Sequence, residues 1–414
     1  MKSFVDQSPI IVGGGIAGLS TALALAHKGI ASTIIEKCKQ LEAIGAGIQL
    51  TPNATSILAR WKLLNKLTEV ATIPHFLELK DGLSLKIHLR AYLINLTEKY
   101  WKAPYMTLHR AALQKILYNA VIENPLIKYK AGETIVSFAQ SPTNIKITTI
   151  KTDTATEQLH STPLLIGCDG VWSTLRQQSY FHERANFSGF IAWRATTTFD
   201  NLPQNFRSSL QNTKTITAWM GPKNHLVVYP LQSSEKKINF VAITHGENSK
   251  EGWAHKGDKE KLKSLFKGWN SKILQIFDHI DEWSYWPLFQ MKQTRFIGEK
   301  QVFVGDCAHA ALPFAAQGAA MAIEDAATLA EALSLKDFSL TKALLLYETT
   351  RAPRIAAVKK RGDLNRLAYH ATGPIAIARN LMMKIRTPES IMSDLNWLYM
   401  YDAMNSIKNN DKNL

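Results

Sequence analysis

The sequence has little cysteine and no long apolar run. Only Cys38, Cys168 and Cys307 occur among 414 residues, and none belongs to a CxxC pair. A disulfide framework or a structural zinc site therefore has little support, and we expect three small buried thiols and no metal site. No stretch approaches the roughly 20 apolar residues that cross a bilayer. The N-terminus also lacks the basic and apolar regions of a signal peptide, which favours a cytoplasmic protein.

Acidic residues are scarce, since the chain has 34 of them against 49 lysines and arginines, a net charge of +15. The basic residues are scattered and do not alternate with aromatic residues along one stripe, so we do not expect nucleic-acid binding. A positive field favours anionic cofactors and substrates, and it is compatible with weak association with a membrane surface. The apolar content of 46% suffices for two packed domains. The composition leaves the oligomeric state open, a homodimer included.

The order of the expected helices and strands indicates an α/β fold with an α+β insert. The first fifty residues predict a strand, a glycine turn, a helix and a strand, which is a βαβ unit and implies a parallel sheet. The expected strands are 8–12, 31–36, 133–138, 144–150, 215–219, 225–229 and 301–304, and the expected helices are 19–28, 53–61, 111–121 and 318–332. The β-rich stretch between about 185 and 243 therefore interrupts a nucleotide-binding domain.

We expect three parts. A Rossmann-like domain with a parallel sheet is made of residues 1–72, 98–184 and 283–370, a β-rich domain of residues 73–97 and 185–282, and a helical C-terminal segment of residues 371–414.

Gly13-Gly14-Gly15-Ile16-Ala17-Gly18 fits the pattern GxGxxG between an expected strand and helix. In this pattern Gly13 permits a tight turn, Gly15 lets backbone N–H groups approach a pyrophosphate, and Gly18 allows the helix to pack closely on the strand. The helix N-terminus adds partial positive charge beside the phosphates. Glu36, at the end of the second strand, could accept hydrogen bonds from both ribose hydroxyls. The motif therefore predicts a site for FAD or NAD, with Ala17 among its contacts.

Two further carboxylates follow apolar strands. Asp169-Gly170 comes after Leu164-Leu165-Ile166-Gly167, and Asp306 follows Val302-Phe303-Val304-Gly305. An isolated Asp-Gly is usually a turn, but ligands bind at the carboxyl edge of a parallel sheet. Asp306 could then bind a ribityl chain. The helix that begins near Gly318-Ala319 could direct backbone donors at a flavin carbonyl.

With these motifs in this order, the chain resembles the flavoprotein aromatic hydroxylases, a group that includes salicylate hydroxylase, 3-hydroxybenzoate 6-hydroxylase and p-hydroxybenzoate hydroxylase. The stretches most similar to the salicylate hydroxylase branch are 45–54, which contains Gln49, and 108–114, 192–195 and 397–403. The sequence departs from the pattern at Ala310, where relatives often have proline, and at Cys168 and Cys307, where alanine is common.

The resemblance implies the roles of several residues. Arg110 should reach the FAD pyrophosphate, and Asp306 should reach the ribityl or pyrophosphate region. Asp169 should connect the flavin and nicotinamide functions, Gln49 should contact the cofactor, and Arg176 is a further candidate. The implied enzyme is a single-component FAD-dependent monooxygenase. It would use NADH or NADPH and dioxygen to hydroxylate a small phenolic or benzoate-like ring through a flavin hydroperoxide, in a substrate site formed by the β-rich domain.

His225 is the candidate catalytic base, since a histidine in the β-rich domain could take up a phenol proton. The alternative is a partly buried strand histidine with a local hydrogen bond. His309 is expected to shape the flavin loop. Three other functions stay open: a ring hydroxylase of the ubiquinone-biosynthesis type, an FAD oxidoreductase that does not hydroxylate, and a flavin redox sensor.

Overall fold

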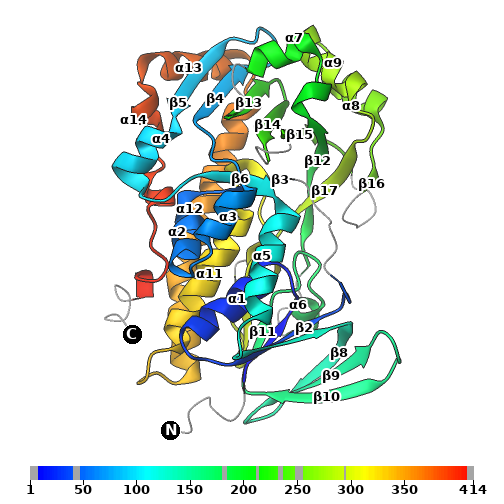
Figure 1. Ribbon diagram of the computed structural model, residues 1–414, viewed down its shortest axis with the longest axis vertical. Coiled ribbons are helices and arrows are strands. Elements are labelled where there is room, and N and C mark those ends of the chain that lie inside the picture. Colours follow the sequence, from blue (N-terminus) through cyan, green and yellow to red (C-terminus); the bar gives the residue numbers. More distant parts are fainter. Residues whose placement is uncertain are drawn as a thin grey trace.

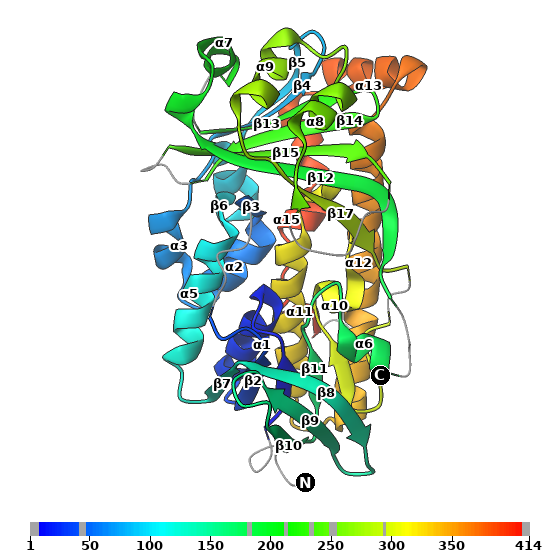
Figure 2. The ribbon, with the colours of Figure 1, turned by 90° about the vertical axis from the view of Figure 1, so that its right-hand side faces the viewer.

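The computed structural model describes residues 8–40, 47–179, 184–210, 214–231, 236–247, 255–292 and 295–407. In Figure 1 a helix-rich part with a small parallel sheet lies below, and a large sheet lies above. Figure 2 shows that the long helix α12 (Leu340–Tyr369) runs along one side of both parts. The molecule therefore has a part with a parallel sheet and a β-rich part, as the sequence predicts, and the helix α12 runs along both.

The lower sheet is parallel and has the strand order β18-β11-β1-β2-β7. Its strands are β1 (Ile10–Val12), β2 (Ser32–Glu36), β7 (Ile127–Ala131), β11 (Leu165–Gly167) and β18 (Gln301–Phe303). The inner strands β1 and β11 are short, apolar and buried because helices cover the sheet, as parallel sheets require. The helices α1 (Ile16–His27), α5 (Arg110–Ile122) and α11 (Gly318–Leu333) pack beside it. The predicted βαβ unit and Rossmann-like fold are confirmed.

A three-stranded antiparallel sheet extends below the parallel sheet. It is formed by β8 (Glu133–Gln140), β9 (Ile145–Lys151) and β10 (Glu157–Thr162), in the order β10-β9-β8. The predicted hairpin is therefore confirmed, with a third strand that the sequence analysis did not specify. A separate pair, β3 (Gly47–Leu50) with β6 (Met106–His109), lies between the lower helices and the large sheet.

The large sheet has eight strands in the order β16-β17-β12-β15-β14-β13-β4-β5. They are β4 (Phe76–Asp81), β5 (Ile87–Tyr92), β12 (Asn186–Thr198), β13 (Thr215–Gly221), β14 (Asn224–Pro230), β15 (Lys237–His245), β16 (His255–Lys256) and β17 (Ser284–Gln290). All neighbours pair antiparallel except β13 and β4. Segments 76–92 and 186–290 thus build one sheet, which extends one strand beyond residue 282. The domain boundaries stay a prediction.

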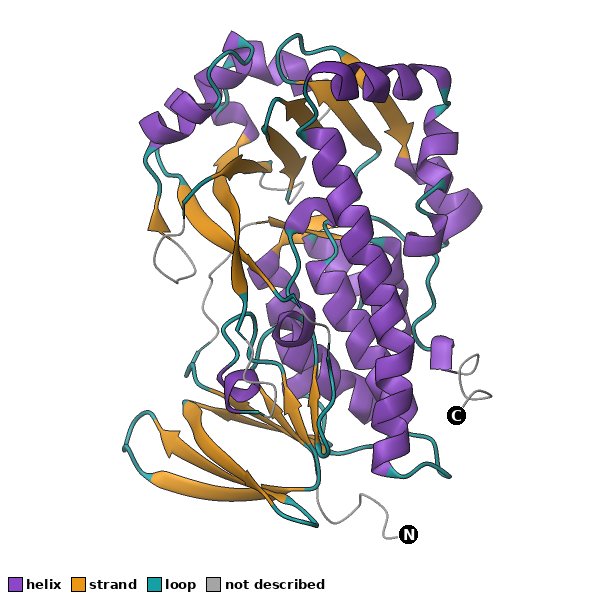
Figure 3. Cartoon of the chain, turned by 180° about the vertical axis from the view of Figure 1, so that it is seen from behind, coloured by secondary structure: helices purple, strands orange, loops and turns teal. Residues whose placement is uncertain are grey.

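The remaining helices are short and mostly cover the large sheet or connect the two parts. They are α2 (Pro52–Arg60), α3 (Leu64–Val70), α4 (Leu93–Leu96), the π-helix Thr97–Trp101, α6 (Thr174–Gln178), α7 (Gln204–Arg207), α8 (Lys259–Leu265), α9 (Ser271–His279), α10 (Asp306–His309), α13 (Gly373–Ile385), α14 (Pro388–Ser393) and α15 (Asn396–Tyr399), with 3₁₀ turns at Phe199–Asn201, Ser208–Leu210 and Pro313–Ala315. Figure 3 shows the C-terminal helices following α12 over the large sheet and down its side. The described part of the segment after residue 371 is therefore mainly helical, as predicted.

The cysteines are only partly as predicted. Cys168 and Cys307 are buried, but Cys38 is half-buried because it lies in the loop beyond the carboxyl end of β2. None of the helices described is long and apolar enough to cross a membrane. In the described ranges no group of three or more His, Cys, Asp or Glu side chains could hold a metal ion.

Candidate active site

The glycine turn between β1 and α1 meets the other two sequence motifs. Gly13 has φ +106°, and a Cβ there would lie 2.5 Å from the Cys168 carbonyl oxygen, beside Asp169. Gly305 has φ +71°, and a Cβ there would lie 3.0 Å from the Cβ of Ala17. The three motifs therefore come together at the carboxyl edge of the parallel sheet, where α/β folds bind ligands.

Gly15 and Gly18 have different surroundings. A Cβ at Gly15 would meet nothing within 4 Å, so the first turn of α1 faces open space. A Cβ at Gly18 would lie 1.8 Å from the Gly13 carbonyl oxygen, so only glycine lets α1 pack this closely. These are the geometries that the predicted roles of the two glycines need. Their contact with FAD stays a prediction.

Glu36 lies at the end of β2 beside this turn. Its Oε2 accepts a hydrogen bond from the backbone N–H of Gly14, and its Oε1 accepts one from the N–H of Cys38 at 2.8 Å. The carboxylate is half-buried and holds the turn from the side where the sequence predicts a ribose. It can therefore present oxygen acceptors to the sugar of a dinucleotide.

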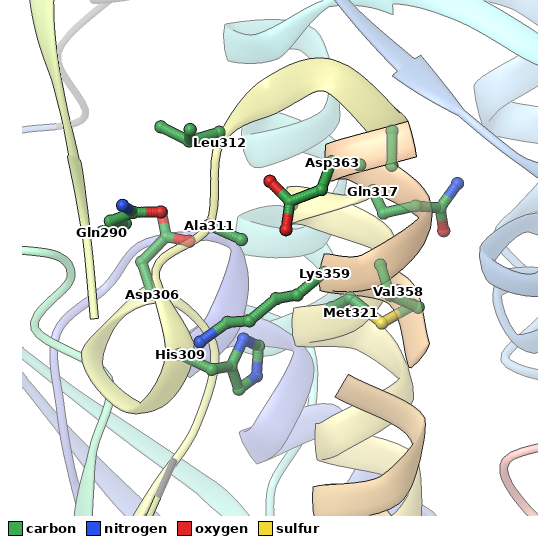
Figure 4. Close-up of a pocket in the computed structure, with 13 residues that line it drawn as sticks. Gln290, Asp306, His309, Ala311, Leu312, Gln317, Met321, Val358, Lys359 and Asp363 are labelled. Carbon is green, nitrogen blue, oxygen red and sulfur yellow. The ribbon is translucent and has the colours of Figure 1, made fainter. Parts of the chain in front are cut away.

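Asp306 is the first residue of α10 and lines a cavity. Figure 4 shows its carboxylate beside Gln290, and Lys359 of α12 extends into the same cavity. The Asp306 side chain is accessible from the cavity, and other protein groups line that cavity around it. Burial therefore raises the pKa of Asp306, while the nearby charges of His309 and Arg110 oppose this effect. Arg110 begins α5, and burial lowers its pKa while Asp306 raises it. The two charges thus approach one site from different parts of the chain.

The same cavity contains the start of α11. Gly318 lines it, and a Cβ at Gly318 would meet nothing within 4 Å. Ala319 is half-buried in the next position. The N-terminus of a helix of 16 residues is therefore open at the place where the sequence predicts a flavin carbonyl.

Lys359 adds a positive charge to the cavity. Its Nζ donates a hydrogen bond to the Met291 carbonyl oxygen at 3.1 Å. Burial lowers the pKa of Lys359 to about 8, with a further contribution from the charge of Arg176. Sequence reasoning missed Lys359, because a lysine on a helix gives no signal of the cavity that it faces.

Asp169 holds the start of α6. Its Oδ2 accepts a hydrogen bond from the Leu175 N–H at 3.2 Å, while its buried Oδ1 has no hydrogen-bond partner in the described part of the chain. Arg176 is buried, and its Nη1 donates to the Arg295 carbonyl oxygen at 2.9 Å. Asp169 therefore has an oxygen to offer a ligand, whereas Arg176 serves the packing of this loop.

Gln49 lies on β3 and Tyr105 just before β6. The hydroxyl of Tyr105 donates a hydrogen bond to Gln49 Oε1 at 2.5 Å, and burial raises the pKa of Tyr105 well above its usual value. Tyr105 was missed in the sequence because its partner lies 56 residues away. The pair fixes the orientation of the predicted cofactor contact.

Arg194 of β12 was also not selected, although it stands in the similar stretch 192–195. Its guanidinium lies 4.2 Å from the centre of the Trp286 ring, and its buried Nε has no hydrogen-bond partner among the described residues. Burial lowers the pKa of Arg194, Tyr229 raises it, and Arg110 lowers it. Arg194 therefore extends the positive site from Arg110 to the large sheet.

His225 lies on β14, buried among aromatic side chains. Its Nδ1 is 2.7 Å from Nε2 of His370, and the rings of Tyr369 and Phe314 lie 5.1 and 5.5 Å from its ring. Burial and His370 both hold the pKa of His225 well below its usual value. The imidazole is therefore neutral near pH 7. Phe314 belongs to the turn Pro313–Ala315, and Leu312 and Ala315 beside it line the cavity, whereas His225 is not among the residues that line it.

Residues 6–361 match the FAD binding domain family. The chain belongs to this family of flavoproteins. It is 31% identical over 401 residues to 3-hydroxybenzoate 6-hydroxylase of Klebsiella oxytoca, covering 96% of this chain and 98% of that enzyme. It is also 31% identical over 400 residues to 3-amino-4-hydroxybenzoate 2-monooxygenase PtnB3 of Streptomyces platensis, covering 95% and 96%. These relatives span nearly the whole chain, so the flavoprotein hydroxylase family that the motifs resemble is confirmed.

Solved structures show the same fold. A salicylate hydroxylase substrate complex has a TM-score of 0.81 at 18% identity and covers 97% of both chains. Klebsiella pneumoniae HpxO with FAD and uric acid has a TM-score of 0.80 at 19% identity and covers 95% of this chain and 97% of the other. From the family match and the relatives, the chain is an FAD-dependent monooxygenase of the aromatic hydroxylase class.

Proposed function

We propose that this protein hydroxylates a small aromatic ring that carries both a carboxylate and a phenolic hydroxyl, using NADH or NADPH and dioxygen. The observation that carries the proposal is the half-buried guanidinium of Arg194, whose buried Nε has no hydrogen-bond partner and which forms no ion pair with a carboxylate among the described residues. A buried charge without a partner is costly, and an anionic ligand would remove that cost. A benzoate carboxylate offers two oxygens that match a guanidinium. The relatives are named for such substrates.

The cofactor site fits FAD, because the open spaces beside Gly15 and Gly318 are where a pyrophosphate and a flavin carbonyl would approach backbone donors. The residues that would hold FAD are Gly13, Gly15, Ala17, Gly18, Glu36, Gln49, Arg110, Asp169, Asp306, Gly318 and Ala319. When bound, FAD supplies the activation of dioxygen with electrons from the nicotinamide. The chain's own task is to bind the ring, exclude water and move one proton.

His225 is proposed as the group that takes the phenol proton. Its Nδ1 is occupied by His370, so Nε2 is the nitrogen left to face a substrate. A neutral imidazole can accept a proton, and deprotonation makes the phenol ring a better nucleophile. His370 would then act on the orientation of His225 and not on the substrate. We also propose a cytoplasmic location for the enzyme.

The test is aromatic-dependent oxidation of NADH and NADPH with identification of the product. The panel contains 3-hydroxybenzoate, salicylate, 3-amino-4-hydroxybenzoate, the amide of each acid, and a prenylated phenol. We expect a hydroxylated product from an acid, weak binding of its amide, and loss of this preference in Arg194→Met. Products from prenylated rings alone would indicate an enzyme of the ubiquinone pathway. Peroxide without any aromatic product would indicate a non-hydroxylating oxidoreductase, and no oxidation at all would indicate a sensor.

A further inference from the structure

A buried cluster of charged side chains lies between the loop that contains Asp306 and the C-terminal segment 397–401. The ion cluster, as we name it, consists of His309, Glu324, Asp325, Arg351 and Arg354. Arg351 donates from Nε to Asp325 Oδ1 and from Nη1 to Glu324 Oε2, both at 2.7 Å. Burial alone would raise the pKa of Asp325, but His309 and Arg351 hold it at about 2. Asp325 is therefore ionised at neutral pH.

On one side the ion cluster fixes the segment that lines the cavity. Oδ2 of Asp325 accepts hydrogen bonds from the Gly305 N–H at 2.9 Å and from His309 Nε2 at 2.5 Å. Asp325 therefore holds both ends of the short helix α10, which begins at Asp306. At the other end of the segment, Asn53 Nδ2 donates hydrogen bonds to Gln317 at 3.1 Å and to Glu324 at 2.6 Å. The cluster thus determines where Asp306 and the start of α11 lie.

On the other side the ion cluster binds the C-terminal segment. Arg354 donates from Nη1 to the Trp397 carbonyl oxygen at 3.0 Å and from Nη2 to that of Leu398 at 2.8 Å. The ring of Tyr401 lies 4.1 Å from the Arg354 guanidinium and 5.7 Å from that of Arg351. One aromatic ring therefore contacts both buried arginines, an arrangement that stabilises desolvated cations.

The same segment supports the opposite wall of the site. The rings of Tyr399 and Tyr105 meet edge to face at 6.0 Å, and Tyr105 holds Gln49 through its hydroxyl. Trp101 also contacts Tyr399, at 4.9 Å between ring centres. Two independent routes thus connect residues 397–401 to predicted FAD contacts. The ion cluster connects them to the loop that contains Asp306, and the pair Tyr399–Tyr105 connects them to Gln49.

We propose that the C-terminal segment 397–401 positions the FAD site, with Tyr401 acting through the ion cluster and Tyr399 acting through Tyr105. Neither tyrosine is expected to contact the cofactor. Their effect is to keep Gly305, Gln317 and Gln49 in the arrangement that binds it. The strength of FAD binding should therefore depend on side chains at the far end of the chain.

The test compares Tyr401→Leu and Tyr401→Phe in the full chain, with Met400→Ala as the matched control. Met400 is the neighbouring residue and is 52% exposed. FAD is titrated into apoprotein, and the Kd and the flavin absorption spectrum are recorded. Loss of a buried cation–π contact should raise the Kd of the leucine variant by about tenfold or more and change its spectrum. Phenylalanine keeps the ring and should restore both, and Met400→Ala should match the wild type.

A leucine variant that binds FAD with unchanged Kd and spectrum would overturn the proposal. Equal losses in the leucine and phenylalanine variants would also overturn it, because the ring would then not be the cause. If Tyr401→Leu does not fold, Tyr401→Met, which keeps most of the volume without the ring, takes its place with the same expectations.

A separate observation concerns α13, which is apolar on its outer face. Its exposed residues include Ile377 at 70%, Leu381 at 55% and Ile385 at 72%, while Arg379 and Met383 are buried against the sheet side. Figures 1 and 2 show α13 at the end of the molecule, beside the β4 and β5 edge of the large sheet. An exposed apolar face on a helix usually marks an interaction surface.

The charges around this face favour a negatively charged partner. The segment of α13 and the residue after it, 373–386, has no acidic residue, and its basic residues are Arg379, which is buried, Lys384, which is exposed, and Arg386, which also pairs with Asp394. A second copy would bring two such basic segments together. Helices that lie on anionic bilayers combine an apolar face with basic residues, and each basic residue near the surface adds to the attraction.

We infer that the outer face of α13 binds the surface of an anionic bilayer. The test is sedimentation of the holoenzyme with phosphatidylcholine vesicles, with and without phosphatidylglycerol. We expect binding only with phosphatidylglycerol, weakened by salt, and lost in the double variant Ile377→Ser and Ile385→Ser. Leu159→Ser, at a residue 80% exposed on β10, should bind as the wild type does. Equal sedimentation of wild type and double variant would refute the inference. A dimer in light scattering that the double variant converts to a monomer would identify a second copy as the occupant instead.

Discussion

Replacing Gly15 by alanine should weaken FAD binding while leaving the free protein intact. In the free protein a Cβ at this position has nothing within 4 Å, and the backbone angles of φ −77° and ψ −174° suit alanine. The folded apoprotein should therefore be as stable as the wild type, or more stable by about 0.4 to 1 kcal/mol, since alanine has less freedom in the unfolded chain. The cost arises only when a pyrophosphate approaches the first turn of α1.

The magnitude follows from the donors that the methyl group would displace. A hydrogen bond from a backbone N–H to a charged group contributes about 1.5 to 3 kcal/mol. Loss of one such bond should raise the Kd for FAD by roughly ten to one hundred times. Gly18→Ala is the contrasting variant, because its Cβ would lie 1.8 Å from a backbone oxygen that cannot move away cheaply. It should destabilise the apoprotein itself by about 1 to 3 kcal/mol.

The assay combines urea unfolding of both apoproteins with FAD titration followed by flavin fluorescence. We expect normal unfolding and weak FAD binding for Gly15→Ala, and early unfolding for Gly18→Ala. An FAD affinity within twofold of wild type in Gly15→Ala would refute the reasoning, since the open space would then not be the path of the pyrophosphate.

Three further predictions concern His225, Asp325 and Gly221, whose contacts are known only from the structure. His225→Asn should slow substrate-dependent hydroxylation by about 10² to 10⁴ at neutral pH and keep FAD bound, while His370→Asn should have a smaller effect; equal stopped-flow rates in wild type and His225→Asn would contradict this. Because the folded pKa of Asp325 is about 2, below its ordinary value of 3.8, its ionisation stabilises the fold above pH 3.8 by roughly 2 kcal/mol, and this is lost as the pH falls toward 2. Urea unfolding at pH 5 and pH 2.5 should show this loss in the wild type and a smaller one in Asp325→Asn. Gly221→Ala should lower the unfolding free energy by about 1 to 3 kcal/mol, since its Cβ would lie 2.3 Å from the Trp269 ring, and unchanged urea unfolding would count against it.

The sequence by itself determined the elements whose signals are local. The strand, glycine turn and helix at 10–27 follow from apolar periodicity and from glycines at fixed spacing, and their observed ends lie within three residues of the expected ones. The carboxylates Asp169 and Asp306 could be placed at one sheet edge because parallel strands present their carboxyl ends together. The fold class and the cofactor were predictable for the same reason, since both depend on short motifs within single segments.

Only the tertiary structure decided which distant side chains meet. His225 and His370 are 145 residues apart, and Asn53 and Glu324 are 271 residues apart. Neither pair has a periodic signal, because side-chain contacts between elements depend on strand register and helix rotation. Arg194 could be read as part of a family stretch, but its position over the Trp286 ring depends on the pairing of β12 with β17. The C-terminal segment had no readable function in the sequence, because the arginines that it contacts lie on α12 and their charges are balanced by carboxylates on α11.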